Sequence, residues 1–250
     1  HPIHLRYKPY WDFLLSSYEG GLDYTGASVY QNKSAGLLDY VMRVFVNGKQ
    51  QTAQAATGNL FQHPKERVED YNRRLQMSYY YNFCSPVIDI YKNHLFKEGV
   101  IEDFEEIQDV VDNVGEDIDR SGSSVNEFRK NLCDVCQVYG HAFVIVDSPN
   151  IPEADLLTKQ DQINQRAFPY LTIHAPQSIL NWSVDEYGSP YWVLVCECYD
   201  TNKDPMNFDK DKKMMVFYRL WTRTDWQLYD MDYNLIGSGV HGLGEVPIVC

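Results

Sequence analysis

The spacing of apolar residues changes at Gly140, and this change constrains the fold more than any other feature of the sequence. Before Gly140, apolar side chains recur every three or four residues, a pattern typical of amphipathic helices. After Gly140 they alternate with polar ones in short runs separated by turn residues, a pattern typical of β-strands. Helices followed by antiparallel strands, without a regular strand–helix–strand repeat, predict an α+β fold.

The longest helical signal opens at His63-Pro64 and runs to Gly99. Proline cannot donate a backbone hydrogen bond, so Pro86 is expected to kink or break this helix. Its apolar residues recur at three- or four-residue steps and form one stripe along the helix. The stripe consists of Val68, Tyr71, Leu75, Tyr79, Phe83, Val87, Ile90, Tyr91 and Leu95.

Three shorter helices are predicted at residues 8–18, 102–119 and 124–139. The first has Pro9 in its opening turn, and the second is rich in acidic residues and has no basic one. Ser124 and Glu127 form a capping box at the start of the third, and Gly140 ends it.

The strands are predicted at residues 141–147, 170–174, 181–184, 191–199, 214–223 and 226–231, with a helical turn at 176–180. The last two strands form a hairpin through Thr224-Asp225. Residues 1–62 are predicted to form an N-terminal helix and an irregular arm. Residues 63–250 are predicted to form one α+β domain, with helices in 63–139 and strands in 141–250.

Charge argues against a domain that grips nucleic acid, because such a domain needs Lys and Arg to displace phosphate counterions. The chain holds 35 Asp and Glu against 22 Lys and Arg, a formal net charge of −13. No stretch approaches the roughly 20 apolar residues that span a membrane. The first residue is not Met, so the numbering is expected to begin after a processed or omitted leader.

Catalytic motifs are scarce in this sequence. There is no P-loop, and Gly237-x-Gly239-x-x-Gly242 matches a dinucleotide-binding motif only in its letters, because no strand–helix–strand unit surrounds it. These glycines are interpreted as turn residues. Asp147, at the end of a hydrophobic strand, is the best single candidate for a catalytic carboxylate, although capping the next turn is its more common role. The sequence therefore favours a structural or assembly protein.

Two alternatives come from other functional classes. Asp103, Glu105, Glu106 and Asp147 would suit a hydrolase or nuclease that binds a divalent metal. The Cys133/Cys136 and Cys196/Cys198 pairs have short spacings that suit a zinc site, which would make the chain a zinc-stabilised binding module. Reduced, buried cysteines are the simpler interpretation of the same pairs.

Several short motifs follow one another in a recognisable order. Pro-Lys-x-x-x-Glu-x-Tyr-x-x-Arg at 64–74 precedes Gly-His-Ala-Phe-Val-Ile-Val-Asp-Ser-Pro at 140–149, and Ala-Pro-Gln-Ser-Ile-Leu-Asn-Trp-Ser-x-Asp at 175–185 leads to a turn and to Gly-Glu-Val-Pro-Ile-Val at 244–249. In this order the sequence resembles the portal proteins of tailed bacteriophages over most of residues 60–250. The residues that carry the resemblance are Tyr71, Arg74, Gly140, Asp147, Pro176, Asn181, Trp182 and Gly188.

The resemblance implies a wing-like domain of a protein that forms a ring, usually of twelve subunits, at one vertex of the capsid. It implies no catalytic residues and no cofactor. The implied partners are the major capsid protein, the terminase motor, tail adaptor proteins and double-stranded DNA, which passes through the ring without being gripped. The implied location is the virion, and the host cytoplasm during assembly.

Portal proteins are commonly much longer than this chain. The stem, clip and crown of the family would therefore mostly follow residue 250, and the sequence is expected to be an N-terminal portion. Residues 22–62 are expected to lie across a neighbouring subunit or against the capsid shell.

Overall fold

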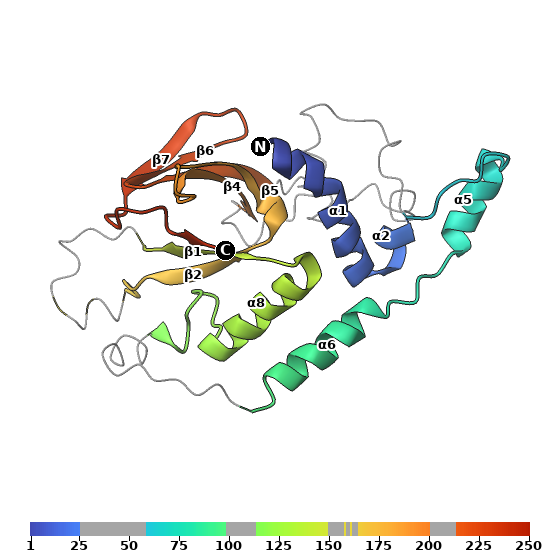
Figure 1. Ribbon diagram of the computed structural model, residues 1–250, viewed down its shortest axis with the longest axis horizontal. Coiled ribbons are helices and arrows are strands. Elements are labelled where there is room, and N and C mark those ends of the chain that lie inside the picture. The colour runs from blue at the N-terminus through green and yellow to red at the C-terminus, as the bar shows by residue number, and fades with distance from the viewer. Residues whose placement is uncertain (26–58, 99–113, 150–157, 159–160, 162–164, 201–213) are drawn as a thin grey trace, which may run out of the picture. The chain divides into compact units, whose positions relative to one another are not determined.

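The computed structural model describes residues 1–25, 59–98, 114–149, 158, 161, 165–200 and 214–250 (Figure 1). Helices precede antiparallel sheets along the chain, which confirms the predicted α+β class. The chain divides into two compact units. Unit 1 contains residues 1–5, 88–197 and 217–250, and unit 2 contains residues 6–87 and 198–216.

The helices described are α1 (Pro2–Glu19), α2 (Gly21–Thr25), α5 (Val68–Met77), α6 (Cys84–Leu95) and α8 (Val125–Tyr139). The sequence placed the start of α1 too late. Pro2 occupies the first helical position, which proline favours, whereas Pro9 lies inside the helix. The end is as predicted: Gly20 has a φ of 70° and donates its N–H to the Ser16 carbonyl at 2.8 Å.

The long helix predicted from His63 to Gly99 is wrong, because residues 78–83 separate α5 from α6. The break lies before Pro86, not at it. The Asn82 Oδ1 atom accepts hydrogen bonds from the backbone N–H groups of Cys84 and Ser85 at 3.0 and 3.2 Å, and so starts α6 there. Pro86 then falls in the first turn, where no N–H is needed.

Most members of the apolar stripe are exposed. Leu75 is buried, with 2% of its surface exposed, but the other members of the stripe that follow it are not. Large exposed side chains from that stripe are Val68, Tyr79, Phe83, Val87, Ile90, Tyr91 and Leu95.

Helix α8 forms as predicted. The Ser124 Oγ atom accepts a hydrogen bond from the Glu127 N–H, and the Glu127 carboxylate accepts one from the Ser124 N–H at 2.8 Å. Gly140 ends the helix with a φ of 83°. The helix predicted at 102–119 lies mostly outside the described residues, and its last part, 115–119, forms turns rather than helix.

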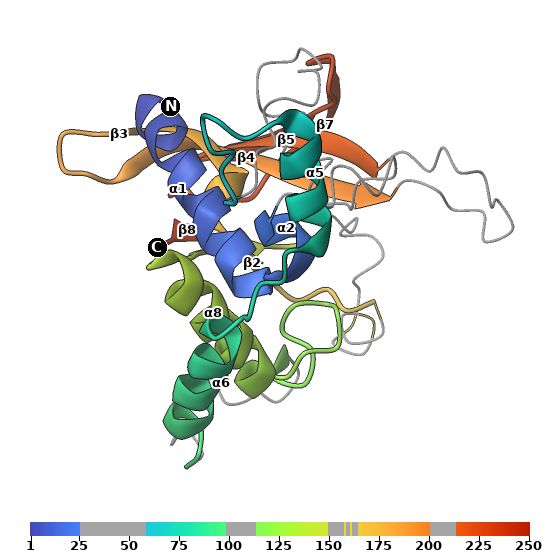
Figure 2. The same cartoon turned by 90° about the vertical axis from the view of Figure 1, so that its right-hand side faces the viewer.

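The strands form two antiparallel sheets in the described part of the chain. The three-stranded sheet has the order β2 (Tyr170–His174), β1 (Phe143–Asp147) and β8 (Ile248–Val249). The five-stranded sheet has the order β3 (Ile179–Val184), β4 (Pro190–Asp200), β5 (Met214–Thr222), β6 (Asp225–Tyr229) and β7 (Leu235–Val240). Figures 1 and 2 show α8 beside the three-stranded sheet.

Most strands agree with the sequence to within two residues, and the β5–β6 hairpin is confirmed. Strand β7 was not predicted. Gly237 and Gly239, interpreted as turn residues, lie inside it. Their missing side chains leave room for Trp226 on β6: a Cβ atom on Gly239 would lie 2.8 Å from the Trp226 Nε1 atom.

Residues from both sheets form the core of unit 1, together with Val246, which precedes β8. Its buried members are Ile145, Ile179, Val193, Val195, Trp221 and Val246. Trp182 and Trp226 pack against this cluster. Tyr191, by contrast, is exposed.

Candidate functional site

Arg219 on β5 is the centre of a half-buried cluster of charged residues in unit 1. Its Nε and Nη2 atoms donate to the two carboxylate oxygens of Glu197 on β4, at 2.7 and 3.0 Å. Its Nη1 atom lies 3.9 Å from an oxygen of Asp147, at the end of β1. Arg219 therefore connects the five-stranded sheet with the three-stranded one through a fork of donors that suits carboxylates.

Asp147 is held from a second side by Tyr170 on β2. The Tyr170 hydroxyl donates a 2.7 Å hydrogen bond to Asp147 Oδ2, the oxygen that faces Arg219. The two residues are directly opposite in the β1–β2 register. The strand pairing alone therefore places the phenol next to the carboxylate.

The ionisation states in this cluster are fixed by burial and by pairing. Burial, followed by the hydrogen bond to Asp147, raises the pKa of Tyr170, so its hydroxyl remains a donor. Burial, with a smaller effect of the nearby Arg219 charge, lowers the pKa of His174 to about 4, so its ring is neutral at pH 7. Burial is the largest single influence on Arg219 and disfavours its charge, but the hydrogen bonds to Glu197 together with the attraction of the Glu197 and Asp147 charges raise the pKa of the guanidinium.

Aromatic rings cover the remaining face of the guanidinium. The Arg219 Cζ atom lies 5.0 Å from the ring centre of Trp226 and 5.7 Å from that of Trp221. Contacts of this kind stabilise a cation that has been partly removed from water. The cluster is thus a paired polar connection between the two sheets.

Gly188 and Asp185 define a second landmark, the turn between β3 and β4. Gly188 has a φ of 85°, which favours glycine, and its N–H donates to the Asp185 carbonyl at 3.1 Å. The Asp185 carboxylate accepts hydrogen bonds from the backbone of Tyr187 and Ser189. Arg223 donates to the same carboxylate at 2.6 Å, which ties the turn to the end of β5.

Three further landmarks lie where the chain enters the five-stranded sheet. Pro176 is buried at the start of a short 3-10 helix (Pro176–Ser178). The Asn181 side chain accepts a hydrogen bond from the Trp182 N–H at 3.1 Å. The Trp182 ring packs against the core and stacks on His1 with ring centres 4.2 Å apart.

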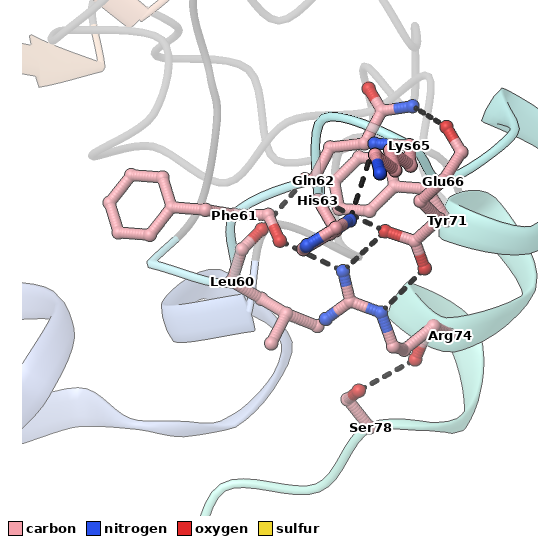
Figure 3. A network of polar contacts seen from close by, with 9 residues as sticks. All are labelled: Leu60, Phe61, Gln62, His63, Lys65, Glu66, Tyr71, Arg74 and Ser78. Atoms are coloured by element: carbon pink, nitrogen blue, oxygen red, sulfur yellow. Dashed lines mark hydrogen bonds and ion pairs between the residues drawn. The ribbon is translucent and has the colours of Figure 1, made fainter.

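Tyr71 and Arg74 of unit 2 meet on α5, as their spacing of three residues implies (Figure 3). The Tyr71 hydroxyl donates to the Leu60 carbonyl at 2.7 Å, and Arg74 Nη2 donates to the Phe61 carbonyl at 2.8 Å. Together these two side chains hold residues 60 and 61 against α5.

Glu66 completes this network. It binds Arg74 through both oxygens, at 2.9 and 2.7 Å, and accepts a hydrogen bond from the His63 N–H (Figure 3). The hydrogen bond from Arg74 is the main cause that lowers the pKa of Glu66 to about 2. Glu66 was not singled out from the sequence, whose motif contains Glu69 at that spacing.

The structure therefore brings Tyr71 and Arg74 together but leaves the other predicted landmarks at separate structural positions. Gly140 caps α8, Asp147 joins the Arg219 cluster, and Gly188 forms a turn. Sequence reasoning missed Arg219, Glu197 and Tyr170. A signal was present for the first two, since Arg219 is the one charged residue of β5, and Glu197 is the one charged residue of β4 before its last position.

The candidate metal ligands are placed only in part. Asp103, Glu105 and Glu106 lie outside the described residues, and Asp147 is held by Tyr170 and Arg219. Within the described ranges, no group of three or more His, Cys, Asp or Glu side chains is arranged to hold a metal ion.

All six cysteines are free thiols. Cys196 is buried, and Cys133, Cys136 and Cys198 are half-buried. Burial is the main cause that raises the pKa of Cys136 and of Cys198. The Cys133 sulfur accepts a hydrogen bond from the Gln137 side chain. The thiols of Cys136 and Cys198 are thus protonated near neutral pH.

Among the helices that the structure describes, none is both long and apolar enough to cross a membrane. Comparison of the sequence with known protein families and with curated proteins finds no match.

Proposed function

We propose that the protein is a portal protein of a tailed bacteriophage, which forms a ring at one capsid vertex. The observation that carries this proposal is the order of the landmark motifs between residues 64 and 249. In the structure the landmark residues cap a helix, form turns, support the core or connect strands. Such roles suit a protein whose task is to hold a shape.

The charge of the chain also supports this function. A channel for DNA has to let the duplex slide, so its walls should not bind phosphates. A net charge of −13 gives a weak, salt-screened repulsion instead. The ring would work with double-stranded DNA, the terminase motor, the major capsid protein and tail adaptor proteins as partners, without a cofactor and without a catalytic site of its own. It would assemble in the host cytoplasm and remain in the virion.

Large exposed side chains give further support. Tyr79, Tyr81 and Phe83 each expose more than 70% of their surface. Aromatic residues are enriched in subunit interfaces, where a large apolar area has to be covered by a partner. The metal-dependent hydrolase is less well supported, because Asp147 is already engaged by Tyr170 and Arg219.

Electron microscopy of the purified protein, together with its mass in solution, tests the proposal. We expect closed rings of about a dozen subunits with a central opening. A protein that remains a monomer at all concentrations, or that cleaves DNA in the presence of Mg²⁺ and loses this activity in Asp147→Ala, would contradict it.

A further inference from the structure

Side chains of the extended segment 78–83 alternate between two environments. Tyr80 and Asn82 face the rest of unit 2: the Tyr80 ring stacks on Tyr24 with centres 3.9 Å apart, and the Asn82 amide donates to the Tyr18 carbonyl at 2.6 Å. This alternation is the pattern of a β-strand with one buried face. The segment is therefore fixed on one side.

Its opposite side carries three aromatic residues, Tyr79, Tyr81 and Phe83, which we call the aromatic row. They are 75%, 71% and 74% exposed. Adjacent rings touch each other, with centres 4.8 and 6.5 Å apart. Within the described residues, no backbone hydrogen bond joins 79–83 to another segment. Within the described part of the chain, this strand-like segment therefore has no partner strand.

Charge marks this region as a contact surface between acidic molecules. From Leu75 to Ile88 the chain has no charged residue, and Arg73 and Arg74 immediately precede that stretch. Two copies of a chain with a net charge of −13 repel each other over most of their surface. A charge-free aromatic region is where that repulsion is weakest, and depletion of charge is typical of interface cores.

A complementary surface exists in unit 1 at strand β7. It is an edge strand, since β6 is its one neighbour in the described sheet. Leu235, Ile236 and Val240 expose 58%, 54% and 80% of their surface. The strand has no Lys or Pro, the residues that usually protect an edge from pairing with another chain. The uncharged stretch 233–244 lies between Asp232 and Glu245, both acidic.

We propose that the aromatic row of one copy docks on the β7 edge of a second copy, with segment 79–83 added to the sheet as a strand. A strand-like segment without a partner strand among the described residues and an unprotected edge strand are the two halves of such a pairing. Because the two surfaces differ, the contact is head-to-tail, the type that can close into a ring.

This inference rests on the proposed function and specifies the contact by which the ring would form. Its test uses two variants. The row variant carries Tyr81→Ser and Phe83→Ser, and the edge variant carries Ile236→Lys and Val240→Lys. Each changes exposed side chains, and circular dichroism checks that both remain folded. Tyr187→Ser, at a turn residue that is 86% exposed, is the matched control.

The measurement is the mass distribution in solution, by mass photometry or sedimentation. We expect the unmodified protein and Tyr187→Ser to form oligomers, and each double variant alone to be monomeric. An equal mixture of the two should give dimers that grow no further, because one intact row meets one intact edge. A mixture that remains monomeric would overturn the head-to-tail pairing.

The two proposals fail in different ways. Rings that persist in both double variants would reject this contact and leave the portal function standing. An unmodified protein without oligomers at any concentration would reject the portal function and the contact together.

Discussion

Arg219 shows at the scale of one residue how a charge is kept inside a strand-rich unit. Its guanidinium is 16% exposed and faces two carboxylates, Glu197 and Asp147, at 19% and 15%. A buried pair of this kind adds little net stability, but the loss of one partner leaves an uncompensated charge. Removing Arg219 is therefore expected to cost more unfolding free energy than the ion pair itself contributes to stability.

We expect Arg219→Met to lower the free energy of unfolding by about 3 kcal/mol, since Glu197 would remain charged and unpaired. The double variant Arg219→Met/Glu197→Met should recover more than half of that loss. Urea unfolding of the three proteins measures both values. Equal losses in the single and the double variant would contradict this account of the cluster.

The Glu66–Arg74 pair predicts a specific dependence of stability on pH. Because the pKa of Glu66 falls from 4.5 to about 2 in the folded protein, the pair stabilises the fold above pH 4.5, and that contribution is lost as the pH falls towards 2. In Arg74→Ala the Glu66 pKa should return towards 4.5, as read from NMR titration of its carboxyl carbon.

Arg67→Ala is the control for this titration. Arg67 pairs with Asp70, but its side chain is 83% exposed, so the pKa of Glu66 should not move when it is removed. A Glu66 pKa that stays near 2 in Arg74→Ala would show that another group holds the carboxylate.

At the scale of elements, strand β7 depends on the absence of a side chain at one position. A Cβ atom on Gly239 would lie 2.8 Å from Nε1 and 3.0 Å from Cε2 of Trp226, a ring that packs against the core. We expect Gly239→Ala to destabilise the protein by about 1–3 kcal/mol, as overpacking usually does. Thermal unfolding checks this value.

Gly237→Ala is the matched variant on the same strand. Its Cβ atom would lie 3.7 Å from the Trp226 ring, an ordinary contact. Its stability should therefore change by less than about 0.5 kcal/mol. Similar losses in the two variants would show that the backbone of β7, and not the tryptophan, requires glycine.

The capping box of α8 gives a second test at this scale. Ser124→Ala removes the oxygen that accepts the Glu127 N–H and should cost about 1 kcal/mol in unfolding free energy. Ser124→Asp retains an acceptor at the same place and should keep most of the stability. If both variants lose the same amount, the side chain does not cap the helix in solution.

These elements differ in how far the sequence specifies them. The capping box of α8, strand β2 and the β5–β6 hairpin were predicted, because their signals are local turn and cap residues. The break at 78–83 was not, since an apolar stripe has the same spacing whether it faces the core or the solvent. Strand β7 was missed because its glycines resemble turn residues and are explained by a tryptophan on another strand.

The polar sites likewise divide into those that follow from local spacing in the sequence and those that depend on how strands are arranged. Tyr71 and Arg74 lie three residues apart on one helix, so their meeting follows from the sequence. Arg219, Glu197 and Asp147 come from three strands. Their meeting depends on strand order and on how two sheets pack, and a single sequence specifies neither.

At the scale of the whole molecule, net charge predicts the response to DNA. A chain with a net charge of −13 has too few cations to release phosphate counterions. We expect binding to a DNA duplex at physiological salt to be weaker than about 100 µM, as measured by fluorescence anisotropy. Tight binding that weakens steeply with added salt would contradict the proposal that the protein forms a channel through which DNA passes without being bound.

The pairing of β1 with β8 has a consequence for the order in which unit 1 folds. Val144 lies opposite Val249, about 100 residues later in the chain. At a synthesis rate of about 5–20 residues per second, several seconds pass between the synthesis of β1 and that of β8. During that time β1 lacks its partner β8 and the core lacks Val246. For that time one edge of β1 is open and Ile145 is incompletely covered, so the nascent chain is more prone to aggregation than the folded unit.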